Sequence, residues 1–269
     1  MNAPERNAHI VIDKVSKVFD SDGRRMVALQ DIELAIPQGQ FVCLLGPSGC
    51  GKSTLLNAIA GFAPPTGGSI LAGGVPVAGP GPERGMVFQE YALFPWMTVE
   101  QNVGFGLEIK GMARPRILER VAGLLKLLSL EDFAKRYPKD LSGGMRQRVA
   151  IARVLALDSP IMLMDEPFGA LDALTRRNLQ DELLRLWAEL KKTVIFVTHS
   201  IEEAIYLADR IVVMTYRPGT VKRDLLVDLP RMRDPAAPEF NALKRELGQL
   251  VMEEQQRHHE AEMRSAAVD

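Results

Sequence analysis

The chain has 269 residues, of which 46% are hydrophobic and 25% are charged, so it can form one large domain or one domain with a small appendage. A formal net charge of −1 argues against a general nucleic-acid surface, and we expect no nucleic-acid partner. Two cysteines, Cys43 and Cys50, are too few for a disulfide framework, which fits a reducing compartment. No signal peptide is expected, and no apolar run is long enough to predict a membrane span.

The N-terminal part of the chain is rich in β-branched residues that partly alternate with polar ones, which is typical of strands. A short apolar run, Phe41–Leu45, suits a strand that is buried on both faces. Before that run, the sequence predicts strands over residues 10–19, 26–29 and 32–36, with turns at 20–25 and 37–39.

A glycine-rich loop follows the apolar run and precedes a helix predicted over residues 55–62. Gly46, Gly51, Lys52 and Ser53 match the phosphate-loop pattern, in which glycines let successive backbone N–H groups face one anion. Lys52 can reach the β- and γ-phosphates of a nucleotide, and Ser53 can offer a hydroxyl ligand to Mg²⁺. A plain glycine turn is the alternative, but the flanking strand and helix favour phosphate binding. The predicted phosphate-binding residues are Gly46, Pro47, Ser48, Gly49, Cys50, Gly51, Lys52, Ser53 and Thr54.

The next segment combines turns, a strand and helices. Turns and short strands are predicted over residues 67–83, and a buried strand over residues 85–88. Thr98 and Gln101 fit a capping box, so a helix is expected to begin there. Apolar residues at helical spacing predict another helix over residues 115–130.

A second glycine-bearing segment, Leu141–Arg148, opens a helix predicted over residues 142–157. Ser142 is suited to cap this helix, and Gly143 and Gly144 leave backbone N–H groups open to an anion. Taken alone, the segment would be an ordinary capped helix. Because the phosphate loop already serves one nucleotide, the segment predicts an anion site for another nucleotide.

Two carboxylates end the strand predicted over residues 161–164. Because side chains alternate along a strand, Asp165 and Glu166 are expected to point in different directions. Asp165 is placed to hold Mg²⁺ through its water shell, as the Asp of a Walker B strand does, and Glu166 is then free to polarise an attacking water. An ordinary acidic turn is the alternative, but the preceding phosphate loop favours the catalytic interpretation.

Strands and helices alternate across residues 41–214, which predicts a mostly parallel sheet with helices around it. The remaining predicted elements are a helix over residues 174–191, a strand over 194–197, a helix that begins at a capping box over 200–203, and a strand over 211–214.

The C-terminal part differs in composition from the rest. Pro230, Pro235 and Pro238 predict a linker, and apolar residues over 240–251 predict one helix that packs on the main domain. The charged end, residues 253–269, is expected to fray. Its two histidines, His258 and His259, fit a solvated helix end better than a metal site.

The phosphate loop and Leu141–Arg148 together resemble the motifs of ATP-binding subunits of ABC transporters. Met145 stands where that signature usually has Gln, which affects a secondary contact. The resemblance implies an α/β fold, with a P-loop NTPase (RecA-like) core, an antiparallel β subdomain and an inserted helical subdomain over about residues 90–155. It places the ATP-binding domain at residues 1–230 and a C-terminal helical tail at 231–269.

The resemblance also implies roles for residues outside the two glycine motifs. Gln89 corresponds to the glutamine that senses Mg²⁺ and the γ-phosphate, and Asp172 belongs to the loop that crosses to the other subunit. His199 corresponds to the histidine that contacts the γ-phosphate. Phe19 corresponds to the aromatic that stacks on adenine, with a core aromatic as the alternative. The implied catalytic residues are Glu166, His199, Lys52 and Gln89, with Ser53, Gln89 and Asp165 at the metal.

The partners implied are a second copy of the chain and two permease subunits, with an extracytoplasmic substrate-binding protein acting indirectly. ATP on Lys52 of one copy is closed over by Ser142 and Gly144 of the other. The expected location is peripheral, on the cytoplasmic face of the inner membrane. Tyr91–Met97 is an apolar segment that we interpret as a docking surface for a permease helix, with core packing as the alternative.

Four stretches narrow the resemblance to importers of nitrate, taurine and alkanesulfonates: Phe94–Val99, Glu166–Arg176, Arg217–Gly219 and Asp228–Arg231. An importer ATPase for another small solute and a soluble ABC ATPase of DNA repair or translation are alternatives. A P-loop kinase of small molecules is a further alternative, but it would not need the signature helix. A nucleotide-gated assembly subunit without turnover would not need both Glu166 and His199.

Overall fold

The computed structural model describes residues 8–21 and 24–266. Its chain divides into two compact units. Unit 1 comprises Met1–Pro80 and Thr193–Asp269, and unit 2 comprises Gly81–Lys192. The chain therefore leaves unit 1 once and returns to it.

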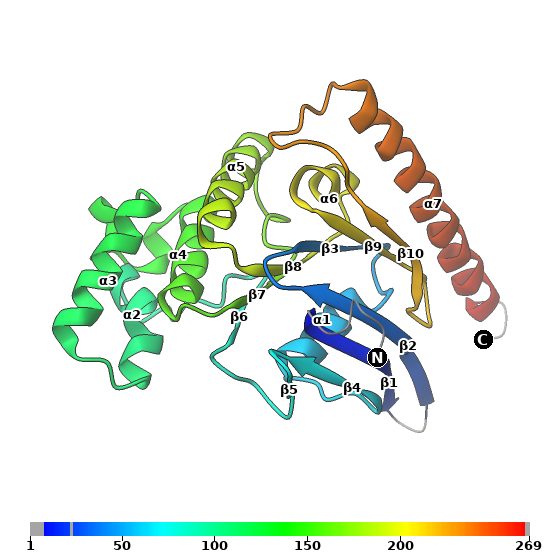
Figure 1. The fold of residues 1–269 in the computed structure, drawn as a ribbon, viewed down its shortest axis with the longest axis horizontal. Coiled ribbons are helices and arrows are strands. Elements are labelled where there is room, and N and C mark those ends of the chain that lie inside the picture. The colour runs from blue at the N-terminus through cyan, green and yellow to red at the C-terminus, as the bar shows by residue number, and fades with distance from the viewer. Residues whose placement is uncertain (1–7, 22–23, 267–269) are drawn as a thin grey trace. The chain divides into compact units, whose positions relative to one another are not determined.

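Unit 1 contains an antiparallel sheet with the strand order β2-β1-β4-β5 (Figure 1). Its strands are β1 (Ala8–Ser21), β2 (Arg24–Pro37), β4 (Gly67–Ala72) and β5 (Val75–Pro76). The two strands predicted over residues 26–29 and 32–36 form the single strand β2. The expected break between them is a register shift, where Asp31 has a φ of 47° and its N–H donates to Ser16 Oγ at 3.0 Å. Residues 22–23, at the centre of the predicted turn, lie outside the described residues.

The second sheet of unit 1 is built around β3 (Phe41–Leu45), which is buried throughout its length. It pairs in parallel with β8 (Thr193–Thr198) and β9 (Arg210–Met214), and β10 (Val221–Leu226) runs antiparallel to β9. The sequence did not predict β10, because its apolar positions are separated by the charged run from Lys222 to Asp224.

The helices of unit 1 are α1 (Lys52–Ala60), α6 (Ile201–Leu207) and α7 (Pro238–Ala266). Ser200 caps α6 by accepting from Glu203 N at 3.3 Å, as predicted. The Glu203 carboxylate accepts a hydrogen bond from Thr198 Oγ1 at 2.6 Å, which ties the helix to the end of β8.

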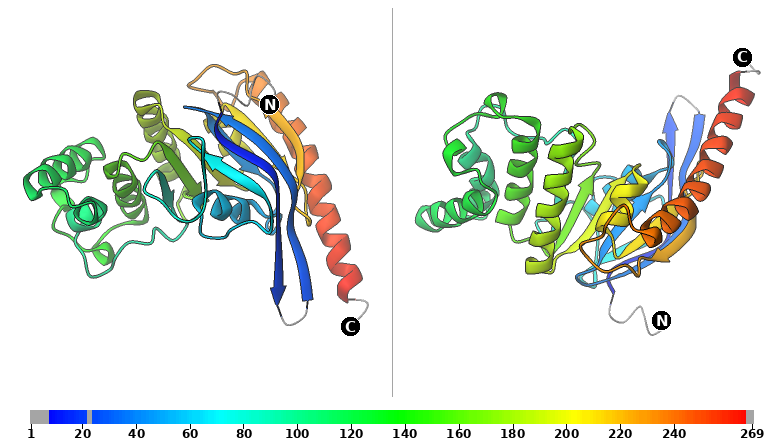
Figure 2. Two further views of the ribbon diagram at one scale, coloured as in Figure 1. Left: turned by 60° about the horizontal axis from the view of Figure 1, so that its bottom comes forward. Right: turned by 90° about the horizontal axis from the view of Figure 1, so that it is seen from above.

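The C-terminal helix α7 packs along the β9–β10 side of unit 1 (Figures 1 and 2). It buries Phe240, Leu247 and Val251 from the predicted apolar stripe. The expectation that the chain frays from Glu253 is wrong, because α7 continues to Ala266. Glu254, which is fully buried, and Lys222 on β10 anchor the helix at this point.

Unit 2 pairs β6 (Arg84–Val87) in parallel with β7 (Ile161–Asp165). Helix α2 packs against α3 and α4, and the complete capping box of Thr98 and Gln101 confirms the predicted start of α2. The helices of unit 2 are α2 (Val99–Ile109), α3 (Arg114–Leu127), α4 (Gly143–Ala156) and α5 (Ala173–Leu190), with 3₁₀ turns at Glu131–Phe133 and Pro138–Asp140. Across the described part of the chain, no helix has the length and apolar character needed to cross a membrane.

Candidate active site

The glycine-rich loop joins the buried end of β3 to the first turn of α1. Gly49 and Gly51 have φ angles of 78° and 97°, in the left-handed region that glycine adopts without strain. A Cβ atom on Gly51 would lie 2.7 Å from Leu29 Cδ2, and one on Gly46 would lie 2.9 Å from Cys50 Sγ. The loop therefore has no room for larger residues at these positions, and its backbone is shaped to surround an anion at the N-terminus of α1.

Lys52 is buried inside this loop, with only 4% of its surface exposed. Its ammonium group donates to Gly46 O at 2.8 Å and to Pro47 O at 2.9 Å. The cation is therefore held by backbone carbonyls where the loop curls. Burial raises the pKa of the neighbouring Cys50 thiol, although Lys52 opposes the shift, so this cysteine is a neutral packing group.

His199 lies at the same edge of the sheet as the glycine-rich loop. Leu45, the last residue of β3, is paired in parallel with Thr198, the last residue of β8. The His199 side chain is exposed directly after this pair. Unit 1 thus brings two of the predicted site elements together at the carboxyl edge of its parallel strands.

Phe19 lies near the end of β1 and is 39% exposed, with the Lys17 ammonium 5.3 Å from its ring centroid. It does not belong to the buried core, so the alternative interpretation as a core aromatic is wrong. Its π face is available as a stacking platform.

Unit 2 supplies the predicted carboxylates at the end of β7. Asp165 is the last residue of that strand, and Glu166 follows with a φ of 42°, a strained conformation for a residue with a side chain. Gln89 comes shortly after β6, the parallel neighbour of β7. A Cβ built on Gly169 would lie 3.9 Å from both Gln89 Nε2 and Glu166 Oε2, so these two side chains approach the same point.

The helix that carries the signature begins as predicted. Ser142 caps α4 by accepting from Met145 N at 3.3 Å, and its side chain is exposed. A Cβ on Gly144 would lie 2.6 Å from Thr175 Cγ2, so α4 approaches α5 closely at this point. Asp172 caps α5, and its hydrogen bonds from the Thr175 N–H and side chain lower the pKa of the carboxyl group.

The residues present fit ATP and Mg²⁺ by their chemistry. The glycine-rich loop has no room for side chains at Gly46 and Gly51, and it leads into the N-terminus of α1. A helix N-terminus reached through such a loop suits a phosphate group. Ser53 is an exposed hydroxyl on the first turn of α1, and Asp165 is a carboxylate. Oxygen ligands of this kind, few in number, are what Mg²⁺ uses when phosphates complete its shell. Within residues 8–21 and 24–266 there is no cluster of three or more His, Cys, Asp or Glu side chains able to hold a metal by itself.

Two features near the site were missed or only partly understood from sequence. Gly219, in the connection between β9 and β10, packs against the phosphate loop, where a Cβ would lie 2.3 Å from Cys50 O. His258 stacks on Tyr216 of that connection, with ring centroids 4.1 Å apart, so this histidine is a packing residue of α7. The Arg217–Gly219 motif is the sequence signal that points to this connection.

Comparison with known proteins identifies the family. The model of the ABC transporter family matches residues 29–169. An uncharacterised ABC transporter ATP-binding protein of Methanocaldococcus jannaschii is 50% identical over 90% of this chain and 91% of its own length. The nitrate import ATP-binding protein NrtD of Synechocystis is 45% identical, covering 88% and 90% of the two chains. The aliphatic sulfonates import ATP-binding protein SsuB of Bacillus subtilis is 44% identical, covering 87% and 91%.

The solved structures agree. A dimeric ATP-binding cassette in a post-hydrolysis state, bound to ADP and Pi, has a TM-score of 0.73 and 35% identity, and covers 82% of this chain and 100% of the cassette. This similarity confirms the predicted P-loop NTPase fold, and cassettes of this kind bind nucleotide. From motifs, fold and relatives alike, the chain belongs to the ATP-binding proteins of ABC transporters, which are ATPases coupled to transport.

Proposed function

We propose that this chain hydrolyses ATP to power a membrane importer of small anions, with nitrate, taurine and alkanesulfonates as the solute classes. The observation that carries the proposal is the buried Lys52 at the start of α1. It lies within a loop whose positions 46 and 51 have no room for a side chain larger than that of glycine. The named relatives that import nitrate and aliphatic sulfonates support the choice of solutes.

In this proposal the chain binds ATP mainly through unit 1. The backbone N–H groups of residues 46–54 and the Lys52 ammonium hold the phosphates, and Phe19 stacks on adenine. Ser53, Asp165 and Gln89 hold Mg²⁺, directly or through water. When bound, Mg²⁺ neutralises charge on the β- and γ-phosphates.

Hydrolysis in this proposal depends on three polar side chains. Glu166 accepts hydrogen-bond donation from the attacking water and polarises it. Gln89, whose amide approaches the same point as the Glu166 carboxylate, orients the water and senses the γ-phosphate. His199 donates to the γ-phosphate oxygens, where negative charge is greatest.

A second copy of the chain completes the site in the proposed head-to-tail dimer. Ser142, Gly143 and Gly144 of one copy present the N-terminus of α4 to the nucleotide of the other, and Asp172 lies at the crossing loop. The exposed position of Ser142 at the N-terminus of α4 supports this arrangement. ATP binding then draws two copies together, and hydrolysis releases them.

Two permease subunits are the proposed membrane partners, and a substrate-binding protein outside the cytoplasm delivers the solute to them. The chain then works peripherally on the cytoplasmic face of the membrane. The proposed docking surface is Tyr91–Met97, which includes Trp96 with 70% of its surface exposed. The ATP-binding domain is proposed to end near residue 230, with residues 231–269 as a tail and residues 90–155 as the helical subdomain.

The test compares three variants of the full chain: Lys52→Ala, Glu166→Gln and, as a control, Glu119→Gln on an exposed face of α3. Lys52→Ala is expected to abolish ATP binding because the loop loses its cation. Glu166→Gln is expected to bind ATP, to hydrolyse it about 10²–10⁴ times more slowly, and to elute as a dimer when loaded with ATP. Normal hydrolysis by Lys52→Ala, or a monomer for ATP-loaded Glu166→Gln, would contradict the proposal.

The solute is tested by growth of a strain whose own copy carries Glu166→Gln. Taurine or an alkanesulfonate as sole sulfur source, and nitrate as sole nitrogen source, separate the candidates. Failure on one of them, with normal growth on sulfate and ammonium, identifies the imported anion. Normal growth on all of them would overturn the choice of solutes and favour another small solute or a soluble ABC ATPase.

A further inference from the structure

The loop that joins β9 to β10, residues 215–220, is a second support for the phosphate loop. Gly219 N donates to Ala28 O at 2.9 Å, and Gly219 O accepts from Gln30 N at 3.0 Å, so β2 holds this loop in place. From there it contacts the phosphate loop, because Arg217 Nε donates to Gly49 O at 3.3 Å. A side chain at position 219 would collide with the Cys50 carbonyl. The two loops are therefore joined by a hydrogen bond and by close packing.

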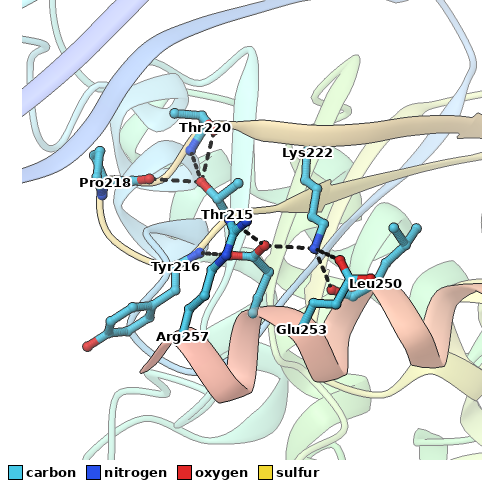
Figure 3. A network of polar contacts seen from close by, with 9 residues as sticks. Thr215, Tyr216, Pro218, Thr220, Lys222, Leu250, Glu253 and Arg257 are labelled. Atoms are coloured by element: carbon cyan, nitrogen blue, oxygen red, sulfur yellow. Dashed lines mark hydrogen bonds and ion pairs between the residues drawn. The ribbon is translucent and has the colours of Figure 1, made fainter. Parts of the chain in front are cut away.

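The same loop is held from its other side by α7 (Figure 3). Glu254 is fully buried, and its carboxylate accepts from the backbone N–H of Tyr216 at 2.9 Å. The Lys222 ammonium donates to this carboxylate at 2.7 Å and also to Glu253 at 2.6 Å. Arg257 Nη1 adds a contact to Glu254 at 3.1 Å. One side chain of α7 thus fixes the start of the 215–220 loop and the start of β10.

Thr215 makes the 215–220 loop a closed unit. Its hydroxyl donates to Pro218 O at 2.8 Å and accepts from Thr220 N at 2.8 Å. Because these hydrogen bonds join the first residue of the loop to Pro218 and Thr220, a displacement at one end of the loop is expected to displace the other end as well. The contacts at Tyr216 are therefore mechanically connected to Arg217 and Gly219, which touch the phosphate loop.

The energetics favour a strong anchor at Glu254. A buried carboxylate is costly unless every partner is kept, and its charge-assisted hydrogen bonds are stronger than neutral ones. Burial by itself lowers the pKa of Lys222, but its hydrogen bonds to Glu253 and Glu254 raise the pKa overall, so the lysine stays charged at neutral pH. Loss of the Glu254 charge weakens the hold on the loop at one end, because the Tyr216 N–H would then donate to a neutral acceptor, and it leaves the pair of Lys222 and Glu253 in place.

We propose that Glu254 on α7 is a positioning residue for ATP binding, which holds the phosphate loop in its binding shape through the 215–220 loop. The inference rests on the proposed function of the phosphate loop. The C-terminal tail then has a role within the ATPase, because α7 supports the phosphate loop through the 215–220 loop. Contacts that shift α7 are therefore expected to change the affinity for ATP.

The test measures MgATP affinity of the full chain by titration calorimetry for Glu254→Gln and for the matched control Glu253→Gln. Glu253 contacts the same lysine, but it is exposed and its carboxylate is bonded to Lys222 rather than to the 215–220 loop. The MgATP affinity of Glu253→Gln is therefore expected to stay at the wild-type value. Glu254→Gln keeps the size of the side chain and is expected to weaken MgATP binding about threefold to thirtyfold. Equal affinities of the two variants would overturn the proposal.

Hydrogen exchange without nucleotide provides the readout that separates positioning from general loss of stability. Glu254→Gln is expected to speed exchange of the amides over residues 46–54 and 215–220 while leaving β7 in unit 2 protected. Uniformly faster exchange would show a merely structural role and would overturn the proposal. If the wild-type chain does not bind ATP, the proposed function fails, and the exchange experiment still decides whether α7 is coupled to the phosphate loop.

A second variant covers the case in which Glu254→Gln does not fold. Thr215→Val removes the hydroxyl that closes the 215–220 loop, keeps its volume and leaves the ion pair on α7 intact. It is expected to weaken MgATP binding in the same direction and to speed exchange over residues 46–54. Unchanged affinity and exchange in a folded Thr215→Val chain would contradict the coupling.

Discussion

Asn102 is fully buried in the first turns of α2 and holds the proposed docking surface, Tyr91–Met97, from beneath. Its Oδ1 accepts from Phe94 N at 2.8 Å, and its Nδ2 donates to the carbonyl oxygens of Phe94 and Met97, each at 3.1 Å. The amide group therefore uses both its donor and its acceptor side on one irregular segment. No hydrophobic residue of similar size can replace it.

Asn102→Ala is expected to lower the free energy of unfolding by about 1–3 kcal/mol, because backbone groups of the docking surface lose their buried partner. The measurement is urea unfolding of the isolated chain. Glu108→Ala, at an exposed position on the same helix, is the control and is expected to change stability by no more than about 0.5 kcal/mol. Equal effects of the two changes would contradict the role of Asn102.

The sequence predicted residues of one kind and missed those of another. Lys52, Glu166 and Ser142 were predicted because their chemistry depends on neighbours along the chain, such as a glycine loop, a strand end or a helix start. Asn102 and Glu254 were not predicted, since their partners are backbone groups and side chains that only the folded chain brings to them. Buried polar residues of this type have no local sequence pattern.

At the scale of elements, the cap of α4 separates a structural role from a catalytic one. Ser142→Ala is expected to cost about 1 kcal/mol of stability, since α4 loses its N-cap. In the proposed dimer the same hydroxyl faces the partner's nucleotide, so ATPase activity should fall much further than stability does. Thermal unfolding and ATPase assays at saturating ATP measure the two effects.

Thr98→Ala is the control for this prediction, because Thr98 caps α2 in the same way and lies outside the proposed nucleotide site. It should lose a similar amount of stability and keep its ATPase activity. If Ser142→Ala and Thr98→Ala lose activity equally, Ser142 acts as a helix cap and nothing more.

Arg233 connects the tail to the end of α6. Its guanidinium is buried and donates to the carbonyl oxygens of Ile205, Ala208 and Leu229. Burial, together with the nearby Arg231, lowers the pKa of Arg233 to about 10, because removal from water disfavours the charged form. The planar guanidinium of Arg offers five N–H donors in a fixed fork, whereas a lysine ammonium offers three from a single point.

Arg233→Lys is therefore expected to lower the free energy of unfolding by about 1–3 kcal/mol, because a lysine leaves some of these carbonyls unsatisfied. Urea unfolding of the full chain gives the measurement, with Arg223→Lys on the exposed part of β10 as the control. A midpoint for Arg233→Lys that equals that of the control would show that the extra donors are not needed.

Elements were predicted best where hydrophobic patterning and capping agree. The strand over residues 41–45, the capped starts of α2 and α4 and the strand at Asp165 follow from such agreement. The strand β10 and the full length of α7 were missed because Lys222, Glu253 and Glu254 look like solvated charges in sequence. In the fold Lys222 pairs with both glutamates, and the Glu254 side chain is fully buried.

At the scale of the whole molecule, the residues of the proposed site are divided between the two units. Unit 1 holds the phosphate loop, Phe19 and His199, while unit 2 holds Gln89, the carboxylates and the signature helix. In unit 1 the phosphate loop and His199 follow the paired ends of β3 and β8, and in unit 2 Gln89 and Glu166 follow the paired strands β6 and β7. Sequence motifs predict the residues of the proposed site, and the family resemblance predicts an inserted helical subdomain over about residues 90–155. The larger extent of unit 2, Gly81–Lys192, was not evident, because the chain passes from one unit to the other and back without a linker of distinctive composition.

Coupling to transport is the property that an isolated chain does not need, and Trp96 is the residue of the proposed docking surface that we expect to carry it. Phe94 packs on Phe105, with ring centroids 4.7 Å apart, and the Arg153 guanidinium lies 5.8 Å from the Phe94 ring. Phe94 is therefore part of the support for the docking surface, whereas Trp96 projects from it with 70% of its surface exposed. Phe94 and Trp96 therefore have different roles, and replacing both at once would combine a loss of support with a loss of the exposed contact.

Trp96→Ala is expected to leave folding and the ATPase activity of the isolated subunit unchanged, because its side chain has little to lose within the chain. In the importer reconstituted with its permease subunits, the same change should abolish uptake of the solute and the stimulation of ATPase activity by transport, since an exposed aromatic of this kind is the anchor that an interface uses. Phe62→Ala replaces a different exposed aromatic, which lies in unit 1, and is expected to keep both solute uptake and the stimulation of ATPase activity. Uptake that survives Trp96→Ala would place the coupling contact elsewhere on the molecule, and loss of ATPase activity in the isolated subunit would show that Trp96 supports the site itself.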